Sequence, residues 1–143
     1  MKTLNIILVD DNESFREALK KVLVTKYNAN IIAEASSGEE FQQIKILRKA
    51  DVILMDVMIP DIDGITLTKK ALWHEPSLKF IAITLHYDKV YLETLLEAGF
   101  KGCIFKNNIF SELEPALETV INNRYYFPQD ISIDGRDYFS IKK

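Results

Sequence analysis

Five short apolar runs recur along this chain, and each is followed by a longer segment in which apolar residues recur at helical spacing. The runs are continuous, which is typical of strands buried on both faces of a parallel sheet. Strands that alternate with helices predict right-handed crossovers and helices on both faces. We therefore predict an α/β fold with a five-stranded parallel sheet. The predicted strands are residues 4–9 "LNIILV", 30–36 "NIIAEAS", 51–56 "DVILMD", 79–84 "KFIAIT" and 102–105 "GCIF".

Five helices are expected between and after these strands. In the second, Ser37 and Glu40 suit a capping box for a helix that carries Phe41, Ile44 and Leu47. The fourth is followed by Gly99, a typical residue just past a helix end. The first, third, fourth and fifth predicted helices are, in that order, residues 13–27, 64–73, 87–98 and about 111–121.

The beginning of the last helix has two interpretations. Ser111 with Glu114 suits a cap at residue 111, whereas Pro115 suits the first position of a later helix. The segment after Ile121, "NNRYYFPQDISIDGRDYFSIKK", is polar and aromatic and shows no clear period. We therefore expect one domain over residues 1–122 and a linker or C-terminal tail over residues 123–143, whose aromatic residues pack onto the domain or, as a second choice, face a partner.

Composition excludes several classes of protein. The net charge of −3 offers no basic surface for nucleic acid. The single cysteine, Cys103, excludes an internal disulfide framework and agrees with a reducing compartment. No stretch has the length of a membrane span, and the N-terminal "MKTLNIILVDD" lacks the pattern of a signal peptide. We therefore expect a cytoplasmic protein with no membrane partner.

Polar residues stand at the ends of four predicted strands. They are Asp10 and Asp11 after the first, Asp56 at the end of the third, Thr84 at the end of the fourth and Lys106 after the fifth. An acid that ends a buried strand is costly unless it is paired or binds a metal. The carboxyl ends of parallel strands meet at one edge of the sheet, where ligands bind in such folds. We therefore expect these side chains to gather at that edge.

The chemistry of this set follows from its charge. Three carboxylates close together repel one another and raise each other's pKa, and a divalent cation relieves the repulsion. Oxygen ligands without His or Cys favour Mg²⁺ and argue against zinc. Beside Mg²⁺ a carboxylate can attack a phosphoryl group, while Lys106 and the Thr84 hydroxyl can contact other phosphoryl oxygens.

Four motifs carry a resemblance: "ILVDDNESFREAL", "VILMDVMIPDIDG", "FIAIT" and "GCIFK". Over about residues 3–122 the chain resembles the CheY-like receiver domains of two-component response regulators, and the tail "INNRYYFPQD" resembles the same stretch in NarL/LuxR-type transcription regulators. The resemblance implies a flavodoxin-like (βα)5 fold and phosphorylation by a sensor histidine kinase. It also implies a contact face, often used for homodimers, over residues 87–121, and DNA binding only through an output domain outside this chain.

The resemblance also assigns a role to each matching residue. Asp56 would be the phosphoacceptor, and Lys106 and Thr84 would contact the phosphoryl group, with Thr84 as the switch hydroxyl. The metal ligands would be Asp10, Asp11, Asp56 and the backbone carbonyl of Met58.

The chain departs from the family at three positions. Cys103 stands where receivers usually carry the aromatic residue that moves on activation, and Leu85 stands where a small residue usually leaves room for the phosphoryl group. Asn107 replaces the proline that usually follows the lysine in a cis bond, and a cis bond before another residue costs about 2.5–4 kcal/mol, so we do not expect one. His86 or Tyr87 are candidates to replace the missing aromatic.

Other interpretations stay open. Taken singly, Asp10 or Asp11 suits a helix N-cap, Asp61 and Asp63 suit a turn, and Cys103 suits a small core residue. A degenerate receiver that binds partners without phosphorylation is the main alternative function. A haloacid-dehalogenase-type phosphatase is less favoured, because its nucleophile ends the first strand and needs a second Asp two residues later, where this chain has Asn12.

Overall fold

The computed structural model describes residues 3–85, 88–128 and 139–141. Its strands form one sheet in the order β2-β1-β3-β4-β5-β6-β7, and every neighbouring pair is parallel. The predicted α/β fold is confirmed, and the five predicted strands are β1 to β5. The bounds are β1 Asn5–Val9, β2 Asn30–Ala35, β3 Val52–Asp56, β4 Phe80–Thr84, β5 Gly102–Phe105, β6 Tyr126–Pro128 and β7 Phe139–Ile141.

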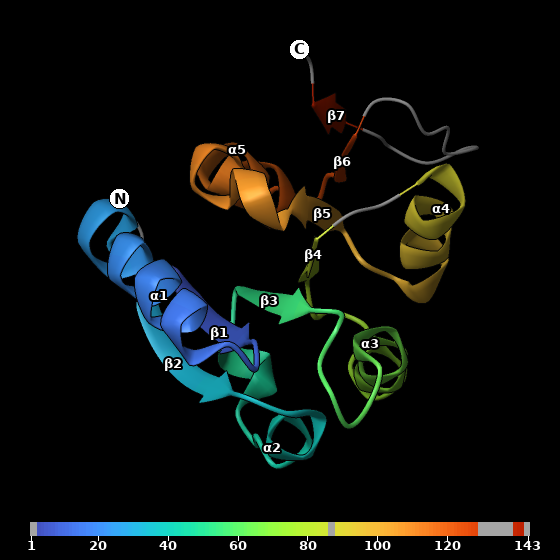
Figure 1. Ribbon diagram of the computed structural model, residues 1–143, viewed down its shortest axis with the longest axis horizontal. Coiled ribbons are helices and arrows are strands. Elements are labelled where there is room, and N and C mark those ends of the chain that lie inside the picture. Colours follow the sequence, from blue (N-terminus) through green and yellow to red (C-terminus); the bar gives the residue numbers. More distant parts are fainter. Residues whose placement is uncertain (1–2, 86–87, 129–138, 142–143) are drawn as a thin grey trace.

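Helices cover both faces of the sheet, as predicted. Figure 1 shows α1 and α5 on one face and α2, α3 and α4 on the other. The bounds are α1 Glu13–Tyr27, α2 Gly38–Gln42, α3 Gly64–His74, α4 Lys89–Ala98 and α5 Ile109–Ile121, with short 3₁₀ turns at Leu47–Lys49 and Lys106–Asn108. Among the described residues, no helix is long and apolar enough to cross a membrane.

The core has two layers because successive side chains of a strand point to opposite faces. Ile6 and Leu8 of β1 pack with α1 and α5, whereas Ile7 and Val9 pack in the layer that contains residues of α2, α3 and α4. Strand β3 is buried along its whole length, so Asp56 stands at the end of a fully buried strand. That placement puts its carboxylate at the edge of the sheet.

The second helix is shorter than the sequence predicts. Ser37 caps α2 by accepting from the Glu40 N–H, but Glu40 reaches back to the Ser36 N–H rather than to that of Ser37. The helix ends at Gln42 because the next N–H groups bond to carbonyls three residues back, which tightens the turn. Ile44 and Leu47 still pack on the core, but from backbone outside the helix.

The last helix begins earlier than either predicted start. The 3₁₀ turn after β5 runs directly into α5 at Ile109, and the Ser111 hydroxyl donates to the Asn108 carbonyl instead of capping a helix. Pro115 lies inside α5. It removes one helical hydrogen bond, and the burial of Leu113 and Ala116 on either side stabilises the helix there. The predicted helix of residues 87–98 is α4, and residue 87 lies outside the described residues.

The predicted tail contributes strands β6 and β7 to the sheet. Strand β6 pairs with β5, and its Tyr126 and Phe127 are buried, so these aromatic residues pack onto the domain as the sequence indicates. Over the described residues, the sheet therefore has two strands more than the five predicted, and both come from the segment after α5.

Candidate functional site

The end of β1 places Asp10 and Asp11 at the edge of the sheet. The Asp10 N–H donates to the Ala35 carbonyl of β2 at 3.0 Å, and Asp10 Oδ1 accepts from the Asn12 N–H at 2.8 Å. Arg16 of α1 donates to the Asp10 carbonyl. The N-cap of α1 is Asn12, whose side chain accepts from the Phe15 N–H, so the interpretation of Asp10 or Asp11 as the cap is wrong.

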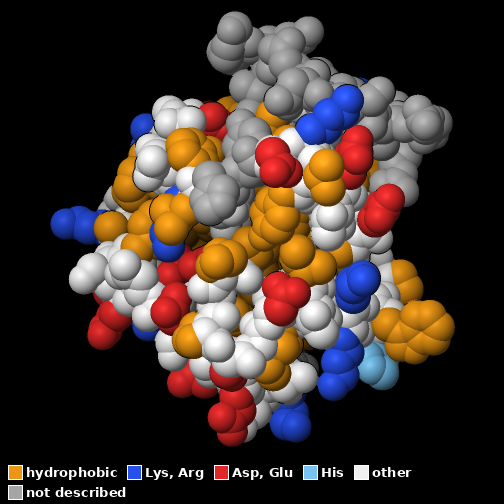
Figure 2. All heavy atoms as spheres, turned by 45° about the vertical axis from the view of Figure 1, so that its right-hand side comes forward, with side chains coloured by type: hydrophobic (Ala, Val, Ile, Leu, Met, Phe, Trp, Pro, Cys, Tyr) orange, Lys and Arg blue, Asp and Glu red, His pale blue; other side chains and the backbone are white. Residues whose placement is uncertain are grey.

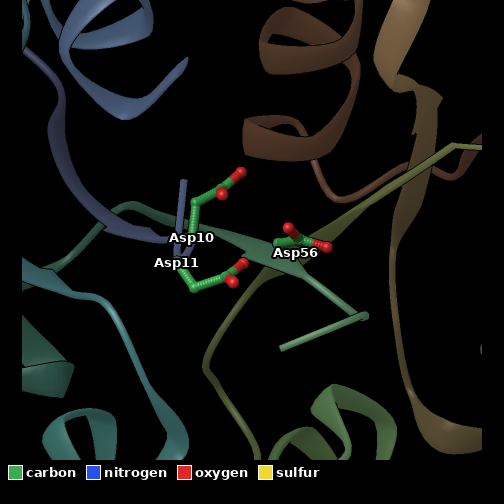
Figure 3. Close-up of side chains that lie close together, drawn as sticks. All are labelled: Asp10, Asp11 and Asp56. Carbon is green, nitrogen blue, oxygen red and sulfur yellow. The ribbon is translucent and has the colours of Figure 1, made fainter. Parts of the chain in front are cut away.

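Asp56 brings a third carboxylate to the same place from the end of β3. Its Oδ1 accepts from the Met58 N–H at 2.9 Å, which orients the carboxylate as the chain turns away from the strand. Figure 3 shows the Asp10, Asp11 and Asp56 side chains around one space at this edge. One oxygen of each lies within 4.8 Å of the others, with Asp10 and Asp56 buried and Asp11 exposed.

Lys106 places its ammonium between the two buried carboxylates. Its Nζ lies 3.1 Å from Asp10 Oδ2 and 3.4 Å from Asp56 Oδ2. The same Nζ lies over the Phe15 ring, 4.4 Å from the centroid. Burial works against the charged form of Lys106, but Asp56 and Asp10 outweigh it, so the pKa of Lys106 lies above its ordinary value.

Asp10 shows the repulsion that the sequence predicts for this cluster. Burial raises the pKa of Asp10, and the neighbouring Asp56 raises it further, against the opposing effects of the Asn12 N–H and Lys106. Asp10 Oδ2 is buried, and the Lys106 ammonium lies 3.1 Å from it. A buried carboxylate oxygen in a group of three acids suits a hard cation, so this acidic pocket could bind a metal.

Thr84 is the last residue of β4, and Leu85 follows it directly. Thr84 is 3% exposed and pairs in register with Phe105, the residue before Lys106, so the structure brings Thr84 to the same edge as the acids. Leu85 is 55% exposed, which keeps its side chain largely in solvent at this edge. His86 and Tyr87, proposed as replacements for the family aromatic, lie outside the described residues.

Tyr91 is a neighbour of the site that the sequence pattern did not single out as a site residue. It lies on α4, is half-buried against the core, and its hydroxyl lies near Thr84. Burial raises the pKa of Tyr91, with Asp63 acting in the same direction. The signal available in the sequence was weak, because a tyrosine on the exposed side of a predicted helix is ordinary.

The remaining candidate residues have structural roles or buried positions. Asp61 accepts from the Gly38 and Glu39 N–H groups, and Asp63 caps α3 by accepting from the Ile65 N–H, so both are turn residues as expected. Cys103 is buried in the core, and burial raises its pKa to about 12. Among the described residues no peptide bond is cis, which includes the bond between Lys106 and Asn107.

Exposed apolar side chains lie near this edge and beyond it. Met58 is 65% exposed and follows Asp56 closely, as Leu85 follows Thr84. Figure 2, which brings the α3 and α4 side forward, shows hydrophobic side chains gathered across the middle of that face among acidic and basic ones. The site edge therefore combines a charged pocket with an apolar rim.

Comparison with known proteins agrees with this geometry. The profile of the response regulator receiver domain matches residues 6–118. The chain belongs to the response regulator receiver domain family. Response regulator GacA of Pseudomonas viridiflava is 32% identical over 127 residues, which cover 88% of this chain and 59% of GacA. Transcriptional regulatory protein DegU of Brevibacillus brevis is 27% identical over 123 residues, covering 86% of this chain and 52% of DegU.

Solved receiver structures have the same fold. The non-phosphorylated receiver domain of RcsB from Escherichia coli is 26% identical, covers 90% of this chain and superimposes with a TM-score of 0.79. A LuxR-family response regulator from Aurantimonas is 25% identical, with 87% of this chain covered and a TM-score of 0.80. The predicted resemblance to receivers of the NarL/LuxR type is confirmed. The chain spans between 52% and 59% of the length of DegU and GacA.

Proposed function

We propose that this receiver domain accepts a phosphoryl group on Asp56 from a phosphohistidine of a sensor histidine kinase, with Mg²⁺ as cofactor. The observation that carries the proposal is the convergence of Asp10, Asp11 and Asp56 with Lys106 at the carboxyl ends of β1, β3 and β5. Membership of the receiver family supports it.

Each of these side chains has its own role in the proposed phosphoryl transfer. An Asp56 carboxylate oxygen attacks phosphorus, the phosphorus–nitrogen bond to the donor histidine breaks, and the bonding electrons leave with the imidazole nitrogen. Asp10, Asp11, Asp56 and the Met58 carbonyl would hold Mg²⁺, which when bound neutralises charge on the phosphoryl oxygens. Lys106 is close enough to Asp56 to stabilise the same charge after turning from Asp10.

The switch would begin at Thr84. A phosphoryl group on Asp56 offers an acceptor to the Thr84 hydroxyl, and Tyr91 of α4 lies near Thr84 in the present structure. Movement of Thr84 toward the phosphoryl group would loosen that contact and bias the position of α4. We propose that residues 87–121 respond and change their affinity for a partner, including a second copy of the chain. We also propose that the protein acts in the cytoplasm and that its output is transcription, through a DNA-binding domain outside this chain.

A degenerate receiver remains the second candidate, because Cys103 and Leu85 depart from the family pattern. The two candidates differ in one measurement. Incubation with Mg²⁺ and phosphoramidate should add one phosphoryl group to the wild-type protein and none to Asp56→Asn, as seen by intact mass. Asp61→Asn is a matched control, because it removes a nearby acid whose carboxylate accepts from the Gly38 and Glu39 N–H groups at the start of α2. Absence of labelling in the wild type, or equal labelling in Asp56→Asn, would favour the degenerate receiver or another acceptor.

A further inference from the structure

The β5 edge of the five-stranded core is covered by the chain's own tail. The Tyr126 N–H donates to the Lys101 carbonyl at 2.9 Å, and Tyr126 stands in register with Gly102 of β5. Figure 1 shows β6 beside β5, where the sheet passes between α4 and α5. Strand β7 pairs with the other side of β6, so the tail moves the edge of the sheet away from β5. Without the tail, β5 itself would present unpaired backbone groups, which are a template for pairing with another chain.

The tail is anchored in both layers of the core. Tyr126 is 4% exposed and belongs to the layer of α1 and α5, where its hydroxyl lies near Glu112. Phe127 is fully buried in the layer of α3 and α4. Outside the core, the Lys101 ammonium lies 4.9 Å from the centre of the Tyr125 ring. Residues 123–128 are therefore a docked segment rather than a free linker.

Removal of this segment would uncover a surface of the kind that proteins use for association. Each buried aromatic ring covers roughly 150–250 Å², so undocking exposes a patch near the size that marks interaction sites in soluble proteins. The patch lies beside the edge of β5 that undocking would leave open. A strand edge can pair with the same edge of a second copy related by a two-fold axis. A second copy of this chain is the occupant that such an edge suits.

We propose that residues 123–128 are a built-in cover of the β5 edge that prevents a second copy of the chain from pairing there. The covered edge lies within the face of residues 87–121, so self-association through that face needs the tail to undock first. A tethered segment acts at an effective concentration of about the millimolar range. A second copy at micromolar concentration therefore competes at a disadvantage of roughly 10³-fold.

The test compares two deletions of a buried phenylalanine ring. Phe127→Ala removes the anchor of the tail, whereas Phe41→Ala removes a ring from the same core layer at α2, far along the chain from the tail. Both lose comparable apolar contact, so general destabilisation affects them alike. Phe127→Leu keeps an apolar side chain and gives a milder variant should Phe127→Ala fold poorly. Because the Phe127→Ala tail lacks its ring, exchange of tails between copies is disfavoured.

Two readouts, both without Mg²⁺ or phosphodonor, decide the proposal. Amide exchange at Tyr126 should accelerate in Phe127→Ala and less in Phe127→Leu, and stay protected in Phe41→Ala. Sedimentation equilibrium should show self-association of Phe127→Ala that is at least about tenfold tighter than that of the wild type. The proposal would be overturned if Phe127→Ala released the tail but self-associated no more tightly than the wild type. It would also be overturned if the Tyr126 amide stayed protected in both Phe127 variants. Neither result bears on phosphorylation of Asp56.

Discussion

Removal of Asp11 should weaken Mg²⁺ binding while leaving the fold intact. Asp11 is the exposed member of the three-acid cluster, and an exposed side chain outside the core contributes little to the free energy of unfolding. Asp11→Ala also removes a negative charge that repels Asp10 and Asp56. In metal-free buffer we therefore expect the variant to be as stable as the wild type within about 0.5 kcal/mol, or slightly more stable.

The effect on the metal is larger. A divalent ion and a carboxylate 4 Å apart attract by about 2 kcal/mol even at the dielectric constant of water, so loss of Asp11 should weaken binding at least about tenfold. Free Mg²⁺ at ten times the wild-type Kd stabilises the wild type by about 1.4 kcal/mol and the variant by about 0.4 kcal/mol. For 143 residues the entropy of unfolding is about 0.3 kcal/mol per kelvin, which converts these values to Tm shifts of about 5 °C and 1 °C.

Thermal unfolding monitored by circular dichroism across a Mg²⁺ titration measures both effects. Glu13→Ala is the matched control, because it removes an exposed acid two residues away that is not part of the cluster. Its Mg²⁺-dependent Tm shift should equal that of the wild type. Equal shifts in Asp11→Ala and the wild type would refute the assignment of Asp11 as a metal ligand and leave it a surface acid.

Three further outcomes follow from the contacts. Lys106→Met leaves Asp10 and Asp56 without their counter-ion, so urea unfolding in metal-free buffer should show a loss of about 2 kcal/mol in the free energy of unfolding. Mg²⁺ should restore part of this loss, and an unchanged urea midpoint would contradict the role of Lys106 as counter-ion. Burial opposes ionisation of Glu34, but Lys20 and Arg16 outweigh it and lower the pKa of Glu34 below 4.5. Glu34→Gln should therefore lower the free energy of unfolding by about 1 kcal/mol at pH 7, and by progressively less as the pH falls below 4.5 through the folded-state pKa. A loss of stability that does not depend on pH would contradict the ion pairs. Cys103, with burial raising its pKa to about 12, should resist iodoacetamide in the folded protein and react in urea, and rapid labelling of the folded protein would show that the thiol is accessible.

The sequence predicted the fold because its apolar runs and helical periods are strong and consistent. It also predicted where the acids, Thr84 and Lys106 meet, since the carboxyl ends of parallel strands share one edge. Those placements depend on chain order and topology alone. The contact of Lys106 with the Phe15 ring depends on side-chain rotamers, which no spacing rule supplies.

The errors in the sequence interpretation have physical causes. Ile44 and Leu47 have helical spacing but reach the core from a 3₁₀ turn and irregular chain, since a buried position does not require a helix. Strand β6 is only three residues long, too short for a detectable period, and it is stabilised by the burial of Tyr126 and Phe127 against residues far away in the sequence. The alternative in which Asp10 or Asp11, taken singly, caps the first helix is wrong because Asn12 has an equally suitable side chain and lies one residue closer to the helix.

The most direct test of the account is the site of phosphorylation. The wild-type protein treated with Mg²⁺ and phosphoramidate should carry one phosphoryl group, and borohydride reduction of the acyl phosphate followed by peptide mass spectrometry should place it on Asp56. Asp56→Asn should carry none under the same conditions, and Asp61→Asn should label as the wild type does. A phosphoryl group on any other residue, or wild-type labelling of Asp56→Asn, would contradict the account.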